Sequence, residues 1–305
     1  MFYQYSSLDE FPEIHPLSEL PSLAEKMLEI CEQGFYVNKQ GQKISIKDQI
    51  SNCIANTKTY TPDHLYFMPA NRTEKGIIEI SRETTSGCAY RLVVKEGLSN
   101  VAGLNYANAF HPGSGYLDQC RAQEETICRA SCLVQSLEKD LTMYEYNQVH
   151  KTQLASDYII YSPDVVFFRD DQYELLGRPF CFSIITSPAV NAKAYLRYEN
   201  KDGHSIIHDV MDARIKKIIL CAIENGVKNL ILGPFGCGAF RNDTKDIASI
   251  FKKYLVDEGL RLYFNKVVFP VFEPVYQGDK LSTFTEVFSI NNNIKKISLD
   301  YIVNP

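Results

Sequence analysis

The sequence has no segment suited to holding a nucleic acid or crossing a membrane. No run of five or more Lys and Arg residues occurs, and 37 acidic residues outnumber 32 basic ones, giving a net charge of −5. Such a chain has no overall positive field to attract a phosphate backbone, so we expect no direct nucleic-acid binding. No stretch approaches the roughly 18 apolar residues that span a bilayer, and no basic segment followed by an apolar one opens the chain. We therefore expect a mature protein that does not associate with membranes.

The sequence also lacks the cysteine pattern of a disulfide framework. Its nine cysteines are scattered, their number is odd, and no CxxC pair occurs. Scattered cysteines favour reduced thiols and an intracellular protein. Cys31, Cys53, Cys181 and Cys221 lie in apolar stretches, where cysteine behaves as a small hydrophobe. We expect a cytoplasmic monomer, with nuclear residence or export without a classical signal as alternatives.

No internal repeat or low-complexity linker divides the 305 residues. A content of 45% hydrophobic and 23% charged residues is that of a folded protein with a sizeable core. We interpret residues 1–60 as an N-terminal helical extension packed on a core over 61–275, followed by a C-terminal tail over 276–305 that we expect to be a strand and loose chain.

Strand and helix patterns alternate along the predicted core. Several β-rich runs are apolar without alternation, as in strands buried on both faces. These runs occupy residues 76–81, 90–95, 100–109, 157–168, 180–186, 228–233 and 265–272. Helical spacing of apolar residues appears over 18–34, 46–54, 123–137, 206–225 and 243–254. The pattern predicts an α/β fold, a three-layer α/β/α body with a mixed, largely parallel sheet and an N-terminal helical extension.

Two glycine-rich loops each join an expected strand to a segment ahead of a helix. The first contains Gly113 and Gly115, and the second contains Gly236 and Gly238. Glycines let backbone N–H groups turn inward and approach an anion closely, as a diphosphate requires. Because ligands of open α/β sheets bind beyond the carboxyl ends of the strands, both loops are candidate ligand sites, although either alone is also compatible with an ordinary turn.

Glu124 and Glu125 fall on the first turn of a predicted helix, just after the first glycine loop. Glutamate is favoured there by the helix macrodipole and by capping of free N–H groups. The catalytic alternative requires a carboxyl group that faces a cleft whose apolar walls raise its pKa, so that it can donate a proton to a glycosidic oxygen.

These residues also carry a resemblance to a known family. The segment of Gly113, Ser114 and Gly115, then seven residues, then Gln123, Glu124 and Glu125 resembles the signature of poly(ADP-ribose) glycohydrolases. The segment Gly236, Cys237, Gly238, Ala239 and Phe240 resembles that family's diphosphate loop. The stretches EICEQGFY, TYTPDHLY, LNYANAFHPGSG, VVFFRDDQYELL, SIITSPAVNA, GPFGCGAFRND and NKVVFPVF are similar to the microbial branch, in the same order, over about residues 20–273.

The resemblance implies a macrodomain core that binds ADP-ribose, or poly(ADP-ribose) on modified proteins, with no metal and no cofactor. By it, Glu125 is the acid that protonates the departing ribose oxygen and then assists the attack of water, and Glu124 contacts the adjoining ribose. It also implies that Asn108 orients the distal ribose, that Asn105 lies near the adenine side, and that Phe240 packs beside the diphosphate. The two glycine loops and Gln123 complete the implied substrate site.

One departure from the family pattern bears on the substrate. Ser114 interrupts what are three consecutive glycines in the family, and a serine keeps that turn if its φ is negative. Its side chain occupies space near the distal ribose or the next unit of a polymer. A second departure is found only in comparison with the animal members of the family, which have an asparagine at the position of Pro234. Three functions stay open: hydrolysis of polymer, removal of a single ADP-ribose from a protein or small compound, and binding without turnover.

Other polar clusters offer weaker sites. His204 and His208 lie four apart near Asp209 and Asp212, a spacing that fits zinc, but without a third ligand motif nearby we favour a solvated helix start. Asp170 and Asp171 fit either a cation site or a turn, and His111 beside the first loop is expected to support the site and not to act in catalysis.

Overall fold

The computed structural model describes residues 16–70, 72, 75–272, 278–289 and 294–296. The α-helices are α1 Leu20–Gln33, α2 Lys47–Asn56, α3 Thr85–Tyr90, α4 Gln123–Ala130, α5 Leu133–Leu137, α6 Thr142–His150, α7 Ala192–Tyr198, α8 His204–Glu224, α9 Thr244–Lys252 and α10 Lys280–Ser289. The strands are β1 Phe35–Val37, β2 Lys43–Ser45, β3 Lys58–Tyr60, β4 Ile77–Ser81, β5 Val101–Ala107, β6 Ile159–Arg169, β7 Leu175–Pro188, β8 Asn229–Ile231, β9 Lys266–Pro270 and β10 Ile294–Lys296. Short 3₁₀ turns cover Leu17–Glu19 and Leu260–Tyr263, and π-helical segments cover Arg91–Lys95 and Lys253–Asp257.

The main sheet is mixed and mostly parallel, as the sequence predicts. Its eight described strands follow the order β10-β4-β9-β8-β5-β7-β6-β3. Strands β10 to β7 pair in parallel, whereas β6 pairs antiparallel with both β7 and β3. A separate two-stranded sheet is formed by β1 and β2. Parallel strands need crossover connections, and the helices between them provide these connections.

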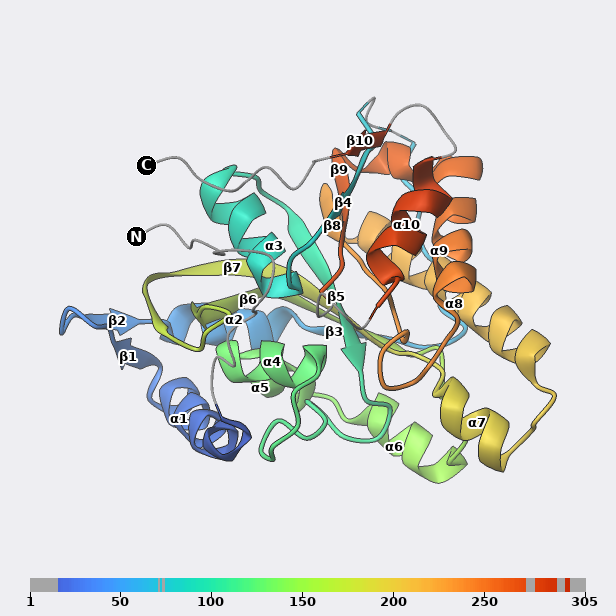
Figure 1. Ribbon diagram of the computed structural model, residues 1–305. Coiled ribbons are helices and arrows are strands. Elements are labelled where there is room, and N and C mark those ends of the chain that lie inside the picture. Colours follow the sequence, from blue (N-terminus) through green and yellow to red (C-terminus); the bar gives the residue numbers. More distant parts are fainter. Residues whose placement is uncertain (1–15, 71, 73–74, 273–277, 290–293, 297–305) are drawn as a thin grey trace.

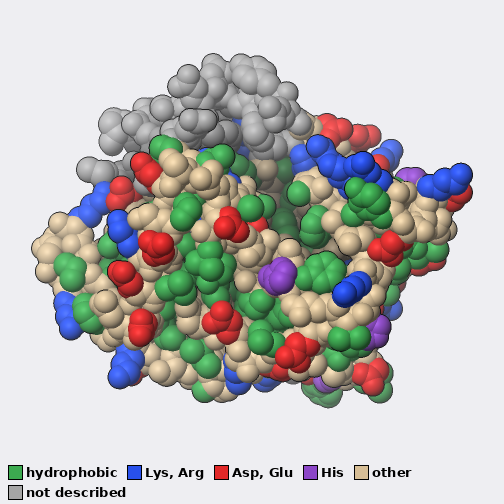
Figure 2. Space-filling model, turned by 90° about the horizontal axis from the view of Figure 1, so that it is seen from below, with side chains coloured by type: hydrophobic (Ala, Val, Ile, Leu, Met, Phe, Trp, Pro, Cys, Tyr) green, Lys and Arg blue, Asp and Glu red, His purple; other side chains and the backbone are tan. Residues whose placement is uncertain are grey.

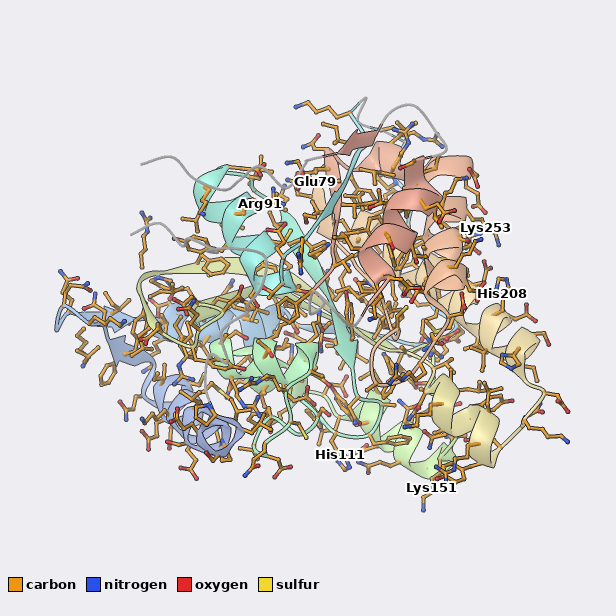
Figure 3. All side chains as sticks on the ribbon, viewed as in Figure 1. Glu79, Arg91, His111, Lys151, His208 and Lys253 are labelled. Carbon is orange, nitrogen blue, oxygen red and sulfur yellow. The ribbon has the colours of Figure 1, made fainter. Side chains whose placement is uncertain are left out.

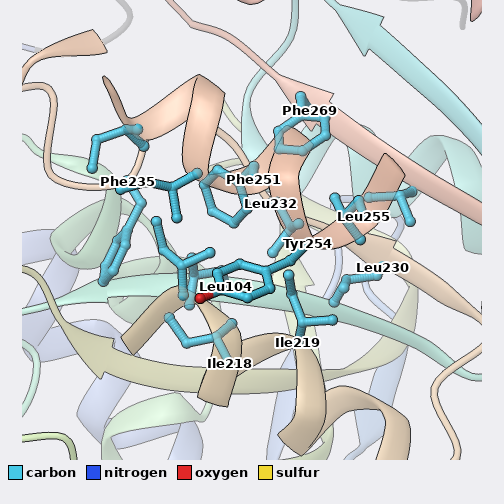
Figure 4. Close-up of a cluster of buried hydrophobic side chains, with 14 of the residues drawn as sticks. Leu104, Ile218, Ile219, Leu230, Leu232, Phe235, Phe251, Tyr254, Leu255 and Phe269 are labelled. Atoms are coloured by element: carbon cyan, nitrogen blue, oxygen red, sulfur yellow. The ribbon is translucent and has the colours of Figure 1, made fainter. Parts of the chain in front are cut away.

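Helices cover both faces of the sheet and make it a three-layer body (Figure 1). One core cluster joins α8, α9 and α10 to the sheet, and the other joins α1 to α6 to the opposite face. Neighbouring strand residues divide between the two clusters, because side chains alternate along a strand: Leu230 faces one cluster and Ile231 faces the other. Figure 4 shows part of the first cluster, with Ile218, Ile219, Leu230, Phe251 and Phe269 among its labelled side chains.

The N-terminal helices form much as predicted. Gly34 ends α1 in the left-handed conformation, with φ of 72°, and its N–H donates to the carbonyl of Ile30. The buried side chains of α1 and α2 belong to the same core cluster as those of α4 and α5. Residues 58–60, inside the predicted extension, form the edge strand β3 of the main sheet.

The expected strand over residues 90–95 is wrong, because this segment is helical. Thr84 caps α3 by accepting a 2.8 Å hydrogen bond from the N–H of Gly87. A π-helical segment then continues through Lys95, and Arg91 in it binds the carboxylates of Glu79 and Glu83. The short run of Leu and Val matched a strand pattern, but the cap and the ion pairs favour the helix.

The single helix expected over 123–137 is two helices. Ser131 breaks it with an extended backbone, φ of −146° and ψ of 178°, and bridges to Phe167 of β6. Its hydroxyl donates to the carbonyl of Ile127 and accepts from the N–H of Leu133, so both helix ends are satisfied at this break.

The described part of the C-terminal region contains a helix that the sequence analysis did not expect, followed by a short strand. Its main described element is the helix α10, which packs on α9, and Phe284 and Phe288 are buried against Phe269. A three-residue strand, β10, then pairs with β4 at the edge of the sheet. The predicted boundary at 275–276 lies outside the described residues. Among the helices that the structure describes, none has both the length and the apolar character needed to cross a bilayer.

Candidate active site

The two glycine loops lie at the same edge of the sheet. Strands β5 and β8 are parallel neighbours, and the first loop follows β5 while the second follows β8, so both leave the sheet at its carboxyl edge. Figure 2 looks onto this edge and shows a hollowed surface with hydrophobic and charged side chains around it. Figure 3 places His111 at this lower edge, and the Glu79–Arg91 ion pair at the opposite one.

A pocket of about 110 Å³ opens between the two loops. Asn108 from the first loop and Phe240 from the second both line it, so the structure brings these two predicted residues together. The other lining residues are Ala109, Phe110, Thr152, Gln153, Ala155, Ala189 and Asn191.

The side chain of Asn108 organises the first glycine loop. Its Oδ1 accepts hydrogen bonds from the backbone N–H groups of Phe110 (2.7 Å) and His111 (3.1 Å). Its Nδ2 lies 3.4 Å from the hydroxyl of Ser114. The loop that follows β5 is therefore fixed by a side chain that also faces the pocket.

The turn at residues 113–114 uses two left-handed residues. Gly113 has φ of 71°, and a Cβ added to it would lie 2.8 Å from the ring of Tyr116. Ser114 has φ of 54°, so the condition of a negative φ is not met and the serine adopts the left-handed conformation. A left-handed conformation costs a non-glycine residue about 1–2 kcal/mol, which surrounding contacts must offset. Gly115 is also closely packed, since a Cβ there would lie 2.8 Å from the sulfur of Cys120.

The second glycine loop closes tightly and then turns toward solvent. Gly236 has φ of 73°, and a Cβ there would lie 2.5 Å from Nδ2 of Asn242, which donates to the carbonyls of Val190 and Gly236. A Cβ on Gly238 would meet nothing within 4 Å. The thiol of Cys237 is buried, and burial raises its pKa to about 12, so it is an uncharged part of the wall.

Backbone donors accompany the exposed end of this loop. The N–H groups of Gly238, Ala239 and Phe240 find no acceptor among the described residues, which leaves them available to an anion. Helix α9 begins at Thr244, as predicted, and the carboxylate of Asp243 caps it by accepting from the N–H of Asp246.

Gln123 ties the start of α4 to the open edge of β5. Strand β8 pairs with β5 only as far as Gly103. Beyond that residue, the side-chain amide of Gln123 forms hydrogen bonds with the backbone of β5. Its Nε2 donates to the carbonyl of Leu104 (2.7 Å) and its Oε1 accepts from the N–H of Tyr106 (2.9 Å). Because this amide is used inside the protein, Gln123 positions the two glutamates that follow it.

Glu124 is buried, with 2% of its surface exposed. Its Oε2 accepts a 2.7 Å hydrogen bond from the backbone N–H of Asn108, and its Oε1 accepts a 3.2 Å bond from Nδ2 of Asn105. Burial raises the pKa of Glu124 to about 8, and the charge of Glu125 adds to the rise, although both hydrogen bonds oppose it. The catalytic interpretation of the sequence required a carboxyl group with a raised pKa. The structure places such a group at Glu124.

Glu125 lies next to it, 5% exposed, and carries out the capping that its position favours. Its Oε2 accepts a 3.0 Å hydrogen bond from the N–H of Ala122. No described residue donates to its Oε1. One oxygen of Glu125 is thus used in the helix cap, and the other is uncommitted.

Asn105 is fully buried, at 0% exposure, and its Nδ2 donates to Glu124 and to the hydroxyl of Thr186 (3.3 Å). The structure thus shows Asn105 buried beside Glu124, and the expected contact near adenine stays a prediction.

The weaker candidate sites are built into ordinary contacts. His208 pairs with Asp246, and Asp212 pairs with Lys253. Asp170 accepts from backbone N–H groups of its own turn, and Asp171 accepts from the hydroxyl of Thr84. Within the described ranges, no three His, Cys, Asp or Glu side chains gather in a way that would hold a metal ion.

Sequence reasoning missed the third wall of the pocket, which comes from residues 152–155 and from Ala189 and Asn191. Residues 152–155 have no glycine and no chemical pattern that marks them. Asn191 lies in the SIITSPAVNA stretch that resembles the microbial branch, so a signal for it was present.

Comparison with known proteins identifies the family. The family model described as "microbial-type PARG, catalytic domain" matches residues 24–170, where PARG stands for poly(ADP-ribose) glycohydrolase. The crystal structure of poly(ADP-ribose) glycohydrolase from Thermomonospora curvata is 31% identical, with a TM-score of 0.80 over 89% of this chain and 100% of that chain. The enzyme from Deinococcus radiodurans in complex with ADP-ribose is 31% identical, with a TM-score of 0.68 over 78% of this chain and 96% of that chain. No curated protein matches the chain significantly.

The family model covers the first glycine loop and the glutamate pair, and the solved structures agree with the fold. The chain therefore belongs to the poly(ADP-ribose) glycohydrolase family, in its microbial type, and is a glycosidase.

Proposed function

We propose that this chain hydrolyses the O-glycosidic ribose–ribose bonds of poly(ADP-ribose), with Glu125 as general acid and base. The observation that carries the proposal is the pair of adjacent carboxyl groups at the start of α4. Both oxygens of Glu124 are bound inside the protein, whereas one oxygen of Glu125 is uncommitted. Related structures support the ligand class: one from Deinococcus radiodurans holds ADP-ribose, and one from Thermomonospora curvata holds the inhibitor ADP-HPD.

The proposed reaction needs one carboxyl group that gives and then takes a proton. Glu125, in its protonated form, donates to the bridging oxygen as the bond from the anomeric carbon to that oxygen breaks and the electron pair leaves with the oxygen. The resulting carboxylate accepts a proton from water as the water oxygen attacks the oxocarbenium-like carbon. The products are a free terminal ADP-ribose and a shortened chain.

Glu124 has a supporting part in this proposal. Because burial raises its pKa to about 8, it is uncharged at neutral pH and places no second negative charge beside Glu125. Its bonds to Asn108 and Asn105 hold the first turn of α4 against the first glycine loop and β5. We propose that it contacts the ribose beside the scissile bond.

The two loops are the proposed diphosphate site. The N–H groups of Gly238, Ala239 and Phe240 are available to an anion, and both Phe240 and Asn108 line the pocket. A fixed array of backbone donors binds a diphosphate without reorganisation when the ligand arrives.

Removal of a single ADP-ribose from a protein or a small compound is the second candidate. Ser114 favours it, because a side chain stands where the family has a glycine, close to Asn108. Binding without turnover is the third, and the presence of both glutamates speaks against it, since a binding module needs the phosphate loops and no acid.

One experiment separates the three candidates. The purified full chain is offered labelled poly(ADP-ribose) and, in parallel, a mono-ADP-ribosylated protein, and released ADP-ribose is measured over time. Release from polymer is the expected result. Release from the mono-modified protein alone favours the second candidate, and binding of ADP-ribose with no release from either favours the third.

A further inference from the structure

The third wall of the pocket includes a short loop that is tied to its surroundings by several hydrogen bonds. Lys151 and Ala155 flank it in the left-handed region, with φ of 51° and 55°. Two non-glycine residues in this region cost about 1–2 kcal/mol each, so the loop keeps its shape only through its contacts.

Buried groups fix this loop from beneath. Arg214, 1% exposed, donates to the carbonyls of Leu154 and Ala155 and also to that of Pro188, just before the pocket residue Ala189. Asn147 accepts from the N–H of Ser156 and donates to the carbonyl of Ala109 on the first glycine loop. The loop is therefore tied to both neighbouring walls of the pocket.

Glu199, at the end of α7, fixes the loop from the solvent side. Its Oε1 accepts a 2.6 Å hydrogen bond from the N–H of Gln153, and its Oε2 accepts a 2.8 Å bond from the hydroxyl of Thr152. The carbonyl of Gln153 accepts a 2.9 Å bond from the N–H of Asn191. The backbone of Gln153 is thus held on both sides, and Gln153 is one of the residues that line the pocket.

The polar side chains of the pocket differ in how far they are already committed. The oxygen of Asn108 accepts from two N–H groups, the oxygen of Asn191 accepts from the N–H of Ala194, and the hydroxyl of Thr152 is bound to Glu199. No residue that the structure describes forms a hydrogen bond with the side-chain amide of Gln153. Ala109, Phe110, Ala155, Ala189 and Phe240 also line the pocket and contribute apolar surface to it. A neutral amide in such a wall is suited to a partner that both donates and accepts, such as a hydroxyl group.

The size of the pocket limits what it holds. Ligand pockets commonly enclose about 300–1,000 Å³, and this one encloses about 110 Å³. It is therefore large enough for only one part of an ADP-ribose molecule. Its lining includes Asn108 and Phe240, the two residues for which the family resemblance implies a place beside the distal ribose and the diphosphate, whereas Glu124 and Glu125 are not among the lining residues.

We propose that Gln153 is a specificity residue that hydrogen-bonds the hydroxyl groups of the distal ribose, and that Glu199 is the positioning residue that aims it. The proposal rests on the proposed function, since it takes ADP-ribose as the ligand. It gives the site a means of distinguishing ADP-ribose from ADP, which has the same adenosine and diphosphate but no distal ribose.

The test compares the two ligands by isothermal titration calorimetry on the full chain. We expect Gln153→Ala to weaken ADP-ribose binding by roughly three- to tenfold, the effect of one or two lost uncharged hydrogen bonds, and to leave ADP binding unchanged. Gln40→Ala, at the exposed turn between β1 and β2, is the matched control and should change neither. Equal weakening of both ligands, or no weakening of ADP-ribose, overturns the assignment.

The role of Glu199 is tested by a double-mutant cycle. Glu199→Ala should weaken ADP-ribose binding selectively, and Glu199→Gln, which keeps one acceptor oxygen, should restore part of it. If Glu199 acts through Gln153, the double variant binds ADP-ribose no more weakly than Gln153→Ala alone. Fully additive losses overturn the positioning role. Polymer hydrolysis by the parent chain is measured separately. If the variants lose ADP-ribose binding selectively but the parent chain does not hydrolyse polymer, the role of Gln153 is supported and the proposed function is excluded.

Discussion

The Oε2 of Glu124 accepts a 2.7 Å hydrogen bond from the backbone N–H of Asn108. This bond joins the helix that carries the glutamate pair to the loop that turns beneath the pocket. The position of the glutamate pair is therefore coupled to that of the first glycine loop.

Glu125→Gln should lower the rate of ADP-ribose release by at least about a hundredfold, the usual loss when a general acid is removed. The affinity for ADP-ribose should stay within a few-fold, because the glycine loops are unchanged. Release is measured from labelled polymer and affinity by calorimetry. Glu29→Gln, at an exposed position on α1, is the control. Turnover at the parental rate would exclude Glu125 as the acid.

Glu124→Gln should change how stability depends on pH. The pKa of Glu124 is raised from 4.5 to about 8 in the folded protein, so folding favours its protonated form. The stabilisation from this group is fully present below the unfolded pKa and is lost as the pH rises from 4.5 through about 8. The Tm of the parent should thus fall more steeply across that window than the Tm of the variant. A constant difference between the two Tm values from pH 5 to 9 would contradict the assigned shift.

Ser114→Gly should relieve the left-handed strain at φ of 54° and change the free energy of unfolding by no more than about 1 kcal/mol, because glycine also gains freedom in the unfolded chain. If the serine side chain obstructs the polymer, activity on polymer should rise. Asn100→Gly is the control, since Asn100 has a similar φ of 52° but precedes β5 at the opposite edge of the sheet. Unchanged polymer activity would show that Ser114 is not an obstruction.

The two glycines of the second loop should differ when replaced by alanine. Gly236→Ala places a Cβ 2.5 Å from Nδ2 of Asn242 at a φ of 73°, and should destabilise the fold by roughly 2–4 kcal/mol. Gly238→Ala meets no protein atom within 4 Å, so its Tm should match the parent. If the diphosphate lies against this loop, Gly238→Ala should still weaken ADP-ribose binding. Tm comes from thermal unfolding and binding from calorimetry, and an unweakened Gly238→Ala would place the diphosphate elsewhere.

Local patterns predicted much of the fold correctly. The apolar run that forms β5, the glycine loop after it and the helix that starts at Gln123 follow one another in the chain, and their signals are set by neighbouring residues. The strand expected over 90–95 failed because a cap at Thr84 and ion pairs of Arg91 with distant glutamates outweigh a short run of β-branched residues. The sequence also did not predict the break at Ser131, because the break accompanies a backbone bridge to Phe167, a residue far away in the chain.

By itself the sequence determined the order of strand, glycine loop and acidic helix start, because the spacing of apolar residues and the position of glycine act over a few residues. Only the tertiary structure decided that Asn105 is buried beside Glu124, that the Gln123 amide replaces β8 on the open edge of β5, and that Gln153 reaches the same pocket as Asn108. Those relationships depend on the strand order, which brings segments far apart in the chain together, and on burial, which sets the charge of Glu124. Neither is encoded in the spacing of neighbouring residues.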